Sequence, residues 1–151
     1  MRLVIALLAC LIASAAHAAD RAQLDAVSVH LFLTKSGTLS RDVSTDFAAW
    51  NFVPEGEGIP QGERFYAVLV RVRLTAPGEM FAKGPQADVV VTNRQTRKVI
   101  KRERIAEVYI GKDGWTFVPV FVPDAACGPL DIVVTGGGKK IATMLNAKCG
   151  E

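Results

Sequence analysis

Apolar and polar residues alternate over most of the chain beyond its N-terminal segment. In AVSVHLFLT (26–34) every second residue from Val27 to Leu33 is apolar, whereas His30 falls on the opposite, polar face. Successive side chains of a β-strand point to opposite faces, so this pattern predicts a strand with one buried face. The period of 3.6 residues that is typical of an amphipathic helix is absent beyond the N-terminal segment.

The same alternation predicts several further strands. The segment RFYAVLVRVRLT (64–75) has Arg71 and Arg73 on its polar face, and its predicted apolar face consists of Tyr66, Val68, Val70, Val72 and Leu74. ADVVVTN (87–93) and VIKRERIAEVYI (99–110) are separated by five polar residues and predict a hairpin. WTFVPVFV (115–122) follows an Asp-Gly turn, and Pro119 cannot donate to a ladder, so we expect an edge strand or a bulge there.

Two cysteines bracket the last predicted hairpin, in which LDIVV and KIATML flank a glycine-rich turn. If this hairpin is centred on residue 138, Cys127 and Cys149 lie directly opposite each other at its open end. Directly opposed Cα atoms of an antiparallel pair are about 4.5 to 5.5 Å apart, which a disulfide accepts. We therefore predict a Cys127–Cys149 disulfide. A redox pair or a zinc site is less favoured, because C-x-x-C spacing and further ligands are lacking.

These strands predict an all-β protein, a single antiparallel β-sandwich with immunoglobulin-like architecture, over residues 19–151. A parallel α/β fold is excluded because it needs crossover helices. The only helical signal in this part is one possible turn around Asp46–Ala49 (46–49), where Ser44 or Thr45 could cap. No apolar edge is long enough to require pairing between chains.

The first 18 residues, MRLVIALLACLIASAAHA, have the three parts of a secretory signal peptide: Arg2, an apolar stretch, and small residues at Ala16 and Ala18. The stretch is shorter than the roughly 20 residues of a spanning helix. We predict cleavage after Ala18 and a periplasmic or secreted protein. Acylation of Cys10 is disfavoured, because the apolar core before it is very short. Losing Arg2 lowers the net charge from +3 to +2, a mild excess that does not imply nucleic acid or a membrane as a partner, and we predict no nucleic-acid partner and no membrane span.

A long connection, residues 35–63, is the leading candidate for a binding site. It far exceeds the usual ~4 to 6 residues, and loops of such length are functional or disordered. Phe47, Trp50 and Phe52 argue against disorder, because large aromatic side chains bury when they can. They either cover one end of the core or bind a protein or glycan partner. EGEG (55–58) offers oxygen ligands for calcium but lacks the order of residues that makes such a loop specific.

A basic run is the second candidate surface. It lies between residues 94 and 104, is opposed only by Glu103, and consists of Arg94, Arg97, Lys98, Lys101, Arg102 and Arg104. Such a run could bind a polyanion such as a glycan or a lipid headgroup. Lys and Arg also protect an exposed edge strand against aggregation, which needs no ligand. No aromatic residues interleave with the run, so single-stranded nucleic acid is not predicted.

Signals for catalysis and for cofactors are weak. Cleavage after Ala18 leaves His30 as the only imidazole, and no serine lies in a G-x-S-x-G motif. We interpret His30 as a residue of a solvated strand face rather than a catalytic base. The favoured function is a non-enzymatic binding or accessory module of the cell envelope, without cofactor or metal. The alternatives are a carboxylate-based hydrolase of envelope polymers and a polyanion-binding protein that uses the basic run.

Overall fold

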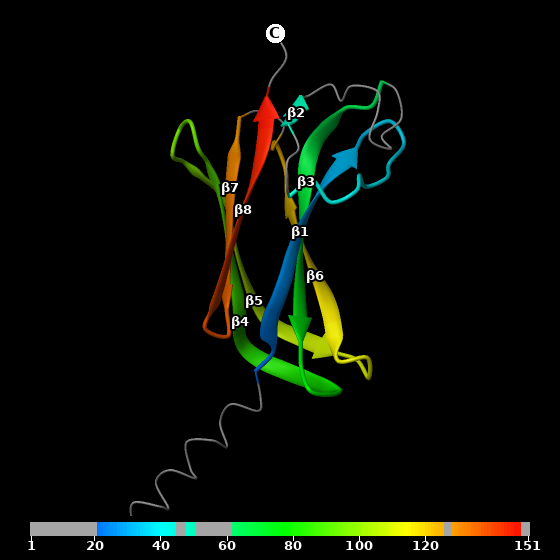
Figure 1. The fold of residues 1–151 in the computed structure, drawn as a ribbon, viewed down its shortest axis with the longest axis vertical. Helices are drawn as coiled ribbons and strands as arrows, with labels where there is room; N and C mark the ends of the chain where they lie inside the picture. The colour runs from blue at the N-terminus through cyan, green and yellow to red at the C-terminus, as the bar shows by residue number, and fades with distance from the viewer. Residues whose placement is uncertain (1–20, 45–47, 51–61, 126–127, 149–151) are drawn as a thin grey trace, which may run out of the picture.

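The computed structural model describes residues 21–44, 48–50, 62–125 and 128–148. Within these ranges the chain forms eight β-strands and no helix (Figure 1). In chain order the strands are β1 (Gln23–Leu33), β2 (Ala48–Trp50), β3 (Phe65–Thr75), β4 (Met80–Asn93), β5 (Val99–Ile110), β6 (Trp115–Val122), β7 (Leu130–Gly136) and β8 (Lys139–Lys148).

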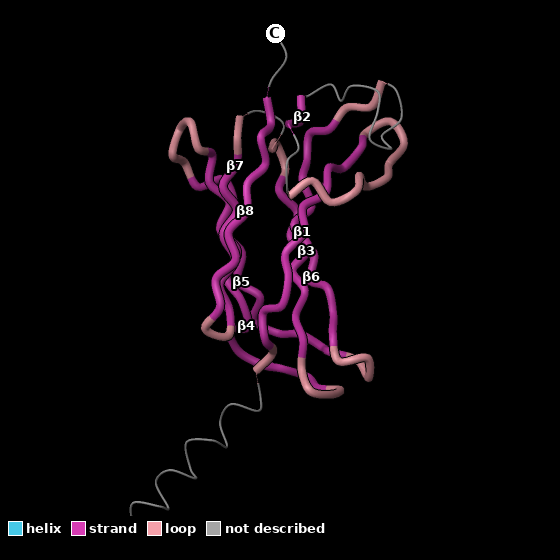
Figure 2. The backbone as a smooth tube through the Cα atoms, in the orientation of Figure 1, coloured by secondary structure: helices cyan, strands magenta, loops and turns pink. Residues whose placement is uncertain are grey.

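The strands form two sheets that face each other (Figure 2). One sheet has the antiparallel order β1-β3-β6. The other has the order β2-β8-β7-β4-β5, in which only the short β2 pairs in parallel, with β8. The predicted antiparallel β-sandwich is therefore confirmed. Its seven long strands are arranged as in an immunoglobulin constant-type sandwich, except that the fourth of them, β5, belongs to the other sheet.

The hydrophobic core lies between the two sheets and follows the predicted alternation. In β3 the side chains of Val68, Val70, Val72 and Leu74 are fully buried, and those between them point outward. The facing sheet contributes Val89 and Val91 of β4, Ile132 and Val134 of β7, and Leu145 of β8. Full burial of one such side chain stabilises the fold by about 1.5 to 3 kcal/mol relative to exposure. A slip of one residue would expose the whole set, so burial fixes the register.

One core prediction is wrong. Tyr66 is exposed, and its neighbour Phe65 occupies the core instead. The β1–β3 register pairs Phe32 with Ala67 and Leu33 with Phe65, which leaves Tyr66 as an extra residue in β3. An inserted residue of this kind is a β-bulge, and it reverses the alternation on one side of itself.

The sheet edges are protected in different ways. β6 is an edge strand that carries Pro119, as predicted, and β5 is one edge of the larger sheet, with β2 at the other. Lys101 and Glu103 of β5 lie opposite the buried Val91 and Val89 and form an ion pair of 2.8 Å. Charges that point inward from an edge strand oppose pairing with other chains. The outer edge of β1 is covered by residues 38–43, whose Ser40 and Val43 donate backbone hydrogen bonds to it and whose Thr38 carbonyl accepts one from Leu33.

The closing hairpin is confirmed, but its register differs by one residue from the prediction. Gly136 pairs with Lys139, because Gly137 and Gly138 form a two-residue turn with φ of 56° and 78°. Two central residues with positive φ are typical of the type I′ turn. The predicted opposition of Cys127 and Cys149 therefore loses its geometric basis. Both cysteines lie outside the described residues, and the disulfide stays a prediction.

The predicted helical turn at residues 46–49 is also wrong where the structure describes it, because Ala48 begins β2. Pairing with β8 supplies backbone partners that an isolated helical turn would lack.

A buried glutamine holds an irregular part of β4. The β4–β5 register shifts between Lys83 and Ala87, and Gln86 fills this bulge. Its side-chain Nε2 donates to the carbonyl oxygens of Lys83 at 3.0 Å and Gly84 at 2.9 Å, and its Oε1 accepts from the backbone N–H of Ala22 at 2.9 Å. These bonds satisfy a buried polar group and connect the bulge to the chain entering β1.

Candidate functional site

The predicted loop site is described only in part. Phe47 and Phe52 lie outside the described residues. Trp50 is the last residue of β2, and its backbone pairs with Lys148 of β8 at the edge of the larger sheet. The parts of the connection before Thr45 and after Gln61 are described, and residues 38–43 of the first part lie along β1.

Glu63 anchors the start of that connection. Its carboxylate is 1% exposed and accepts hydrogen bonds from the backbone N–H groups of Lys35 at 3.0 Å and Ser36 at 2.9 Å. Burial alone would raise the pKa of Glu63, but the hydrogen bonds from the Ser36 hydroxyl and from the two backbone N–H groups outweigh it and lower the pKa below its ordinary value. Glu63 therefore acts as an ionised anchor of the turn.

His30 is buried, at 8% exposure, so its assignment to a solvated face is wrong. Residues 38–43 fold over this side of β1. The His30 Nδ1 lies 2.9 Å from the Ser40 carbonyl oxygen, and Nε2 lies 3.0 Å from the Ser28 hydroxyl. A catalytic histidine of a serine hydrolase is oriented by a carboxylate, whereas this Nδ1 faces a backbone carbonyl. His30 holds the covering segment in place.

Asp42 belongs to the same segment. Its Oδ1 accepts hydrogen bonds from the backbone N–H groups of Val29 at 2.9 Å and Ser44 at 3.0 Å. Partial burial works to raise the pKa of Asp42, but these bonds and the nearby His30 lower it. Asp42 thus connects the covering segment to the edge of β1.

The basic run does not form one continuous patch. Three of its six residues are paired with acids: Arg94 with Asp131 at 3.2 Å, Lys101 with Glu103 at 2.8 Å, and Arg104 with Asp88 at 2.9 Å. Lys101 points toward the core side of the sheet, as described above. Arg97 and Lys98 lie in the β4–β5 turn, and Arg102 is exposed on β5. The run therefore mainly covers an edge strand and its turn.

The outer face of the three-stranded sheet presents a set of exposed rings that the sequence analysis did not single out. We call it the aromatic face and define it as Phe32 of β1, Trp115, Phe117 and Phe121 of β6, and Arg71 and Arg73 of β3. The exposed fractions of its four rings are 37% for Phe32, 41% for Trp115, 37% for Phe117 and 49% for Phe121. Of the β6 residues that alternate with these rings, Val120 and Val122 are buried in the core.

The rings contact one another along the sheet. Trp115 and Phe117 lie edge to face with centroids 5.5 Å apart. Phe32 and Phe121 come from the two outer strands, yet their centroids are 6.4 Å apart, also edge to face. These two rings therefore meet over the central strand, where the small Ala67 lies opposite Phe32. The contacts join β1 and β6 into one apolar surface.

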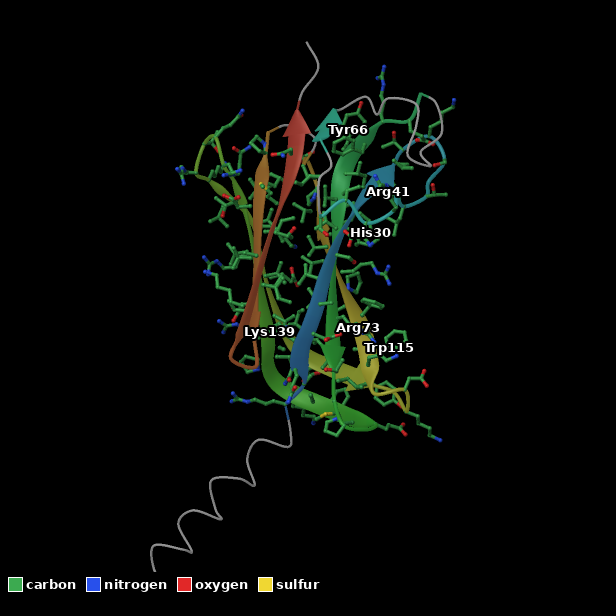
Figure 3. All side chains as sticks on the ribbon, viewed as in Figure 1. His30, Arg41, Tyr66, Arg73, Trp115 and Lys139 are labelled. Carbon is green, nitrogen blue, oxygen red and sulfur yellow. The ribbon has the colours of Figure 1, made fainter. Side chains whose placement is uncertain are left out.

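Two arginines of the central strand lie on this surface. The guanidinium carbon of Arg71 is 4.0 Å from the centroid of Phe117, and that of Arg73 is 5.2 Å from the centroid of Trp115. Figure 3 shows Arg73 and Trp115 together near one end of the sheet. The β3–β6 register pairs Arg71 with Pro119 and Arg73 with Phe117, so each guanidinium leans to the next ring along β6. Diagonal contacts of this kind are within reach of long side chains.

The two arginines differ in their acidic neighbours. Arg73 Nε lies 3.4 Å from Asp25 Oδ2, yet it makes no hydrogen bond within the described part of the chain, so the contact is an ion pair without aligned geometry. Arg71 has no ion pair among the described residues. The aromatic face therefore has an excess of positive charge at its centre.

No helix in the described ranges is long and apolar enough to span a membrane. The same ranges contain no group of three His, Cys, Asp or Glu side chains placed to hold a metal ion. Comparison with protein families and with curated proteins finds no match for this chain.

Proposed function

We propose that the protein is an exported, non-enzymatic binding module of the cell envelope that holds a protein or glycan partner on the aromatic face. The observation that carries the proposal is the row of half-exposed rings on the outer face of the three-stranded sheet, with two arginines among them. The N-terminal residues support export, because they have the parts of a secretory signal peptide.

The composition of the aromatic face favours a recognition surface. Trp, Phe and Arg are enriched where proteins bind partners, and the cations here are arginines rather than lysines. A contiguous patch of apolar side chains on a surface marks an interaction site more often than scattered apolar residues do. The rings are not needed to fill the core, since Val120 and Val122, which alternate with them along β6, are the residues that pack there.

The hydrolase alternative receives less support. A glycoside hydrolase of the common type needs a carboxylic acid whose pKa is raised so that it can donate a proton. Asp42 and Glu63, the carboxyl groups with clearly shifted pKa values in the described ranges, are both shifted downward by backbone N–H groups. The polyanion alternative is weakened by the three ion pairs within the basic run.

Retention on isolated cell envelopes tests the proposal. Phe117→Ser and Phe121→Ser should each lower the amount of protein that sediments with envelopes at least severalfold, because each removes a ring from the aromatic face. Phe81→Ser is the matched control, since Phe81 is 54% exposed on β4, away from this face. Equal retention of all three variants and of the native protein contradicts the proposal. Trp50→Ala separates the two candidate surfaces: loss of retention in that variant alone assigns binding to the loop.

A further inference from the structure

We infer that the ligand of the aromatic face is a linear polysaccharide that carries carboxylate groups, and that Arg71 binds one of these carboxylates. This inference rests on the binding role proposed above. It follows from the position of the two arginines, from their spacing along β3 and from the nature of the β6 edge.

Arg71 is the best placed cation on the face for an external anion. It lies on the central strand, and its cross-strand neighbours Ser28 and Pro119 carry no charge. Its guanidinium packs over Phe117 at 4.0 Å, which fixes the orientation of the group. A guanidinium stacked on a ring keeps its N–H edge free for a planar carboxylate, which it can bind with two parallel hydrogen bonds. The surrounding rings lower the local dielectric constant and strengthen that interaction.

The same combination of ring and arginine occurs twice along the sheet. Arg73 lies two residues beyond Arg71 on β3, and its partner ring, Trp115, lies two residues before Phe117 on β6. Two residues of a strand span about 6.6 Å, so the two pairs repeat at that distance. The Nε of Arg73 is buried beside Asp25, so a ligand would reach only the terminal N–H groups of that guanidinium. A repeated arrangement fits a polymer whose negative charge recurs along its length better than it fits one small anion.

The edge strand argues against an extended peptide as the ligand. A peptide that extends a sheet gains affinity from backbone hydrogen bonds to an open edge. The edge next to the aromatic face is β6, where Pro119 lacks the N–H group for such a bond. A polysaccharide needs no strand edge, because its C–H faces pack on aromatic rings and its hydroxyl and carboxylate groups bind side chains.

A membrane and a second copy of the chain also fit less well. Arg71 and Arg73 lie on the central strand, so a face that entered lipid would bury both charges, which is costly. A second copy docked face to face would place these arginines near each other, and Asp25 is the one acid that the described residues pair with them. The positive centre of the face therefore favours an acidic ligand.

Calorimetric titration with polygalacturonate at low salt, with neutral dextran as a blank, tests the inference. The native protein should bind polygalacturonate and not dextran. Arg71→Gln should weaken binding about tenfold or more, as expected for loss of hydrogen bonds to a charged group. Arg71→Lys should also weaken it severalfold, because lysine keeps the charge but not the planar fork. The control is Arg102→Gln, which removes one exposed charge from β5 and should change affinity less than about twofold.

The outcomes are distinguishable. Equal weakening by Arg71→Gln and Arg102→Gln means that only net charge matters and overturns the inference. Tighter binding of poly-L-glutamate or of anionic phospholipid vesicles than of polygalacturonate, lost in Arg71→Gln, replaces the polysaccharide with another ligand class. If the native protein binds envelopes through the aromatic face but does not bind polygalacturonate, this inference fails and the proposed function stands. If it binds neither, both fail.

Discussion

The guanidinium carbon of Arg71 lies 4.0 Å from the centroid of the Phe117 ring, on a face of the sheet that points away from the core. A cation over an exposed ring stabilises a fold by only about 0.5 to 1 kcal/mol. The contact therefore contributes little to folding, but it fixes a charged group where a partner can reach it.

Substitutions on the aromatic face should have small effects on stability. We expect Phe117→Ser to lower the free energy of unfolding by about 1 kcal/mol or less. The ring is half-exposed, and substitutions of surface side chains change the free energy of unfolding by amounts near that size. Leu74→Ala is the comparison, since Leu74 is fully buried on the other face of the same sheet, and it should cost about 2 to 5 kcal/mol. Urea unfolding measures both, and equal losses would mean that the ring serves the fold.

Gly136→Ala should destabilise the protein. A Cβ atom at Gly136 would lie 2.5 Å from the backbone carbonyl oxygen of Gln86, which the β4 bulge holds in place. Overpacking of this kind costs about 1 to 3 kcal/mol. At Gly78 an added Cβ meets no atom within 4 Å, so Gly78→Ala should change stability by less than about 1 kcal/mol. Thermal or urea unfolding distinguishes them, and a neutral Gly136→Ala contradicts the described bulge.

Stability should fall in acid partly because of Glu63. Its pKa is lower in the folded protein than the value of 4.5 typical of a free side chain, so the unfolded chain binds more protons as the pH falls. Its contribution is complete above the unfolded pKa of 4.5 and is lost progressively as the pH drops below that value and through the lower folded pKa. Glu63→Gln should therefore be less stable at pH 7 and lose less stability on acidification.

Unfolding curves at a series of pH values measure this difference. Glu107→Gln is the control, because Glu107 is an exposed carboxyl group on β5. Its acid sensitivity should match that of the native protein. If the stability of Glu63→Gln falls in acid as much as that of the native protein, the hydrogen bonds from Lys35 and Ser36 are not what lowers the pKa of Glu63.

Cys127 and Cys149 should form a disulfide in protein recovered from an oxidising compartment. Thiol titration under denaturing conditions should then find no free thiol in the cleaved chain. The measured mass should be that of a chain that begins at Ala19. Reduction should lower the free energy of unfolding by about 3 kcal/mol, as expected for a loop of this length. Two free thiols, or a mass that includes residues 1–18, would contradict the predicted export and crosslink.

Period-two alternation predicted the core of this fold because each long strand has one face toward the opposite sheet. Val70 and Val72 are buried where the pattern requires it. Tyr66 was misassigned because it is the extra residue of a β-bulge and has no paired residue in β1. No local sequence signal shows that β1 lacks a partner for it. His30 was misassigned because residues 38–43, which follow β1, fold back over its outer side, and the alternation within the strand does not reveal this.

The aromatic face was not predicted, although part of its signal is present in the sequence. WTFVPVFV is apolar at nearly every position, so the segment fits equally well a strand buried on both faces. Only the sheet order reveals that β6 has core on one side alone, which leaves Trp115, Phe117 and Phe121 outside. The arginines that accompany them come from β3, and their contact depends on cross-strand register.

The most direct test of the binding surface is nuclear magnetic resonance of the isotopically labelled protein during titration with soluble envelope polysaccharide. We predict that amide and side-chain shifts concentrate on β6, on the outward residues of β3 around Arg71, and near Phe32, with the Arg71 side-chain signal among the most affected. Shifts confined to the β4–β5 turn or to the residues around Trp50 would contradict the account, because they would place the partner on the larger sheet or its edge.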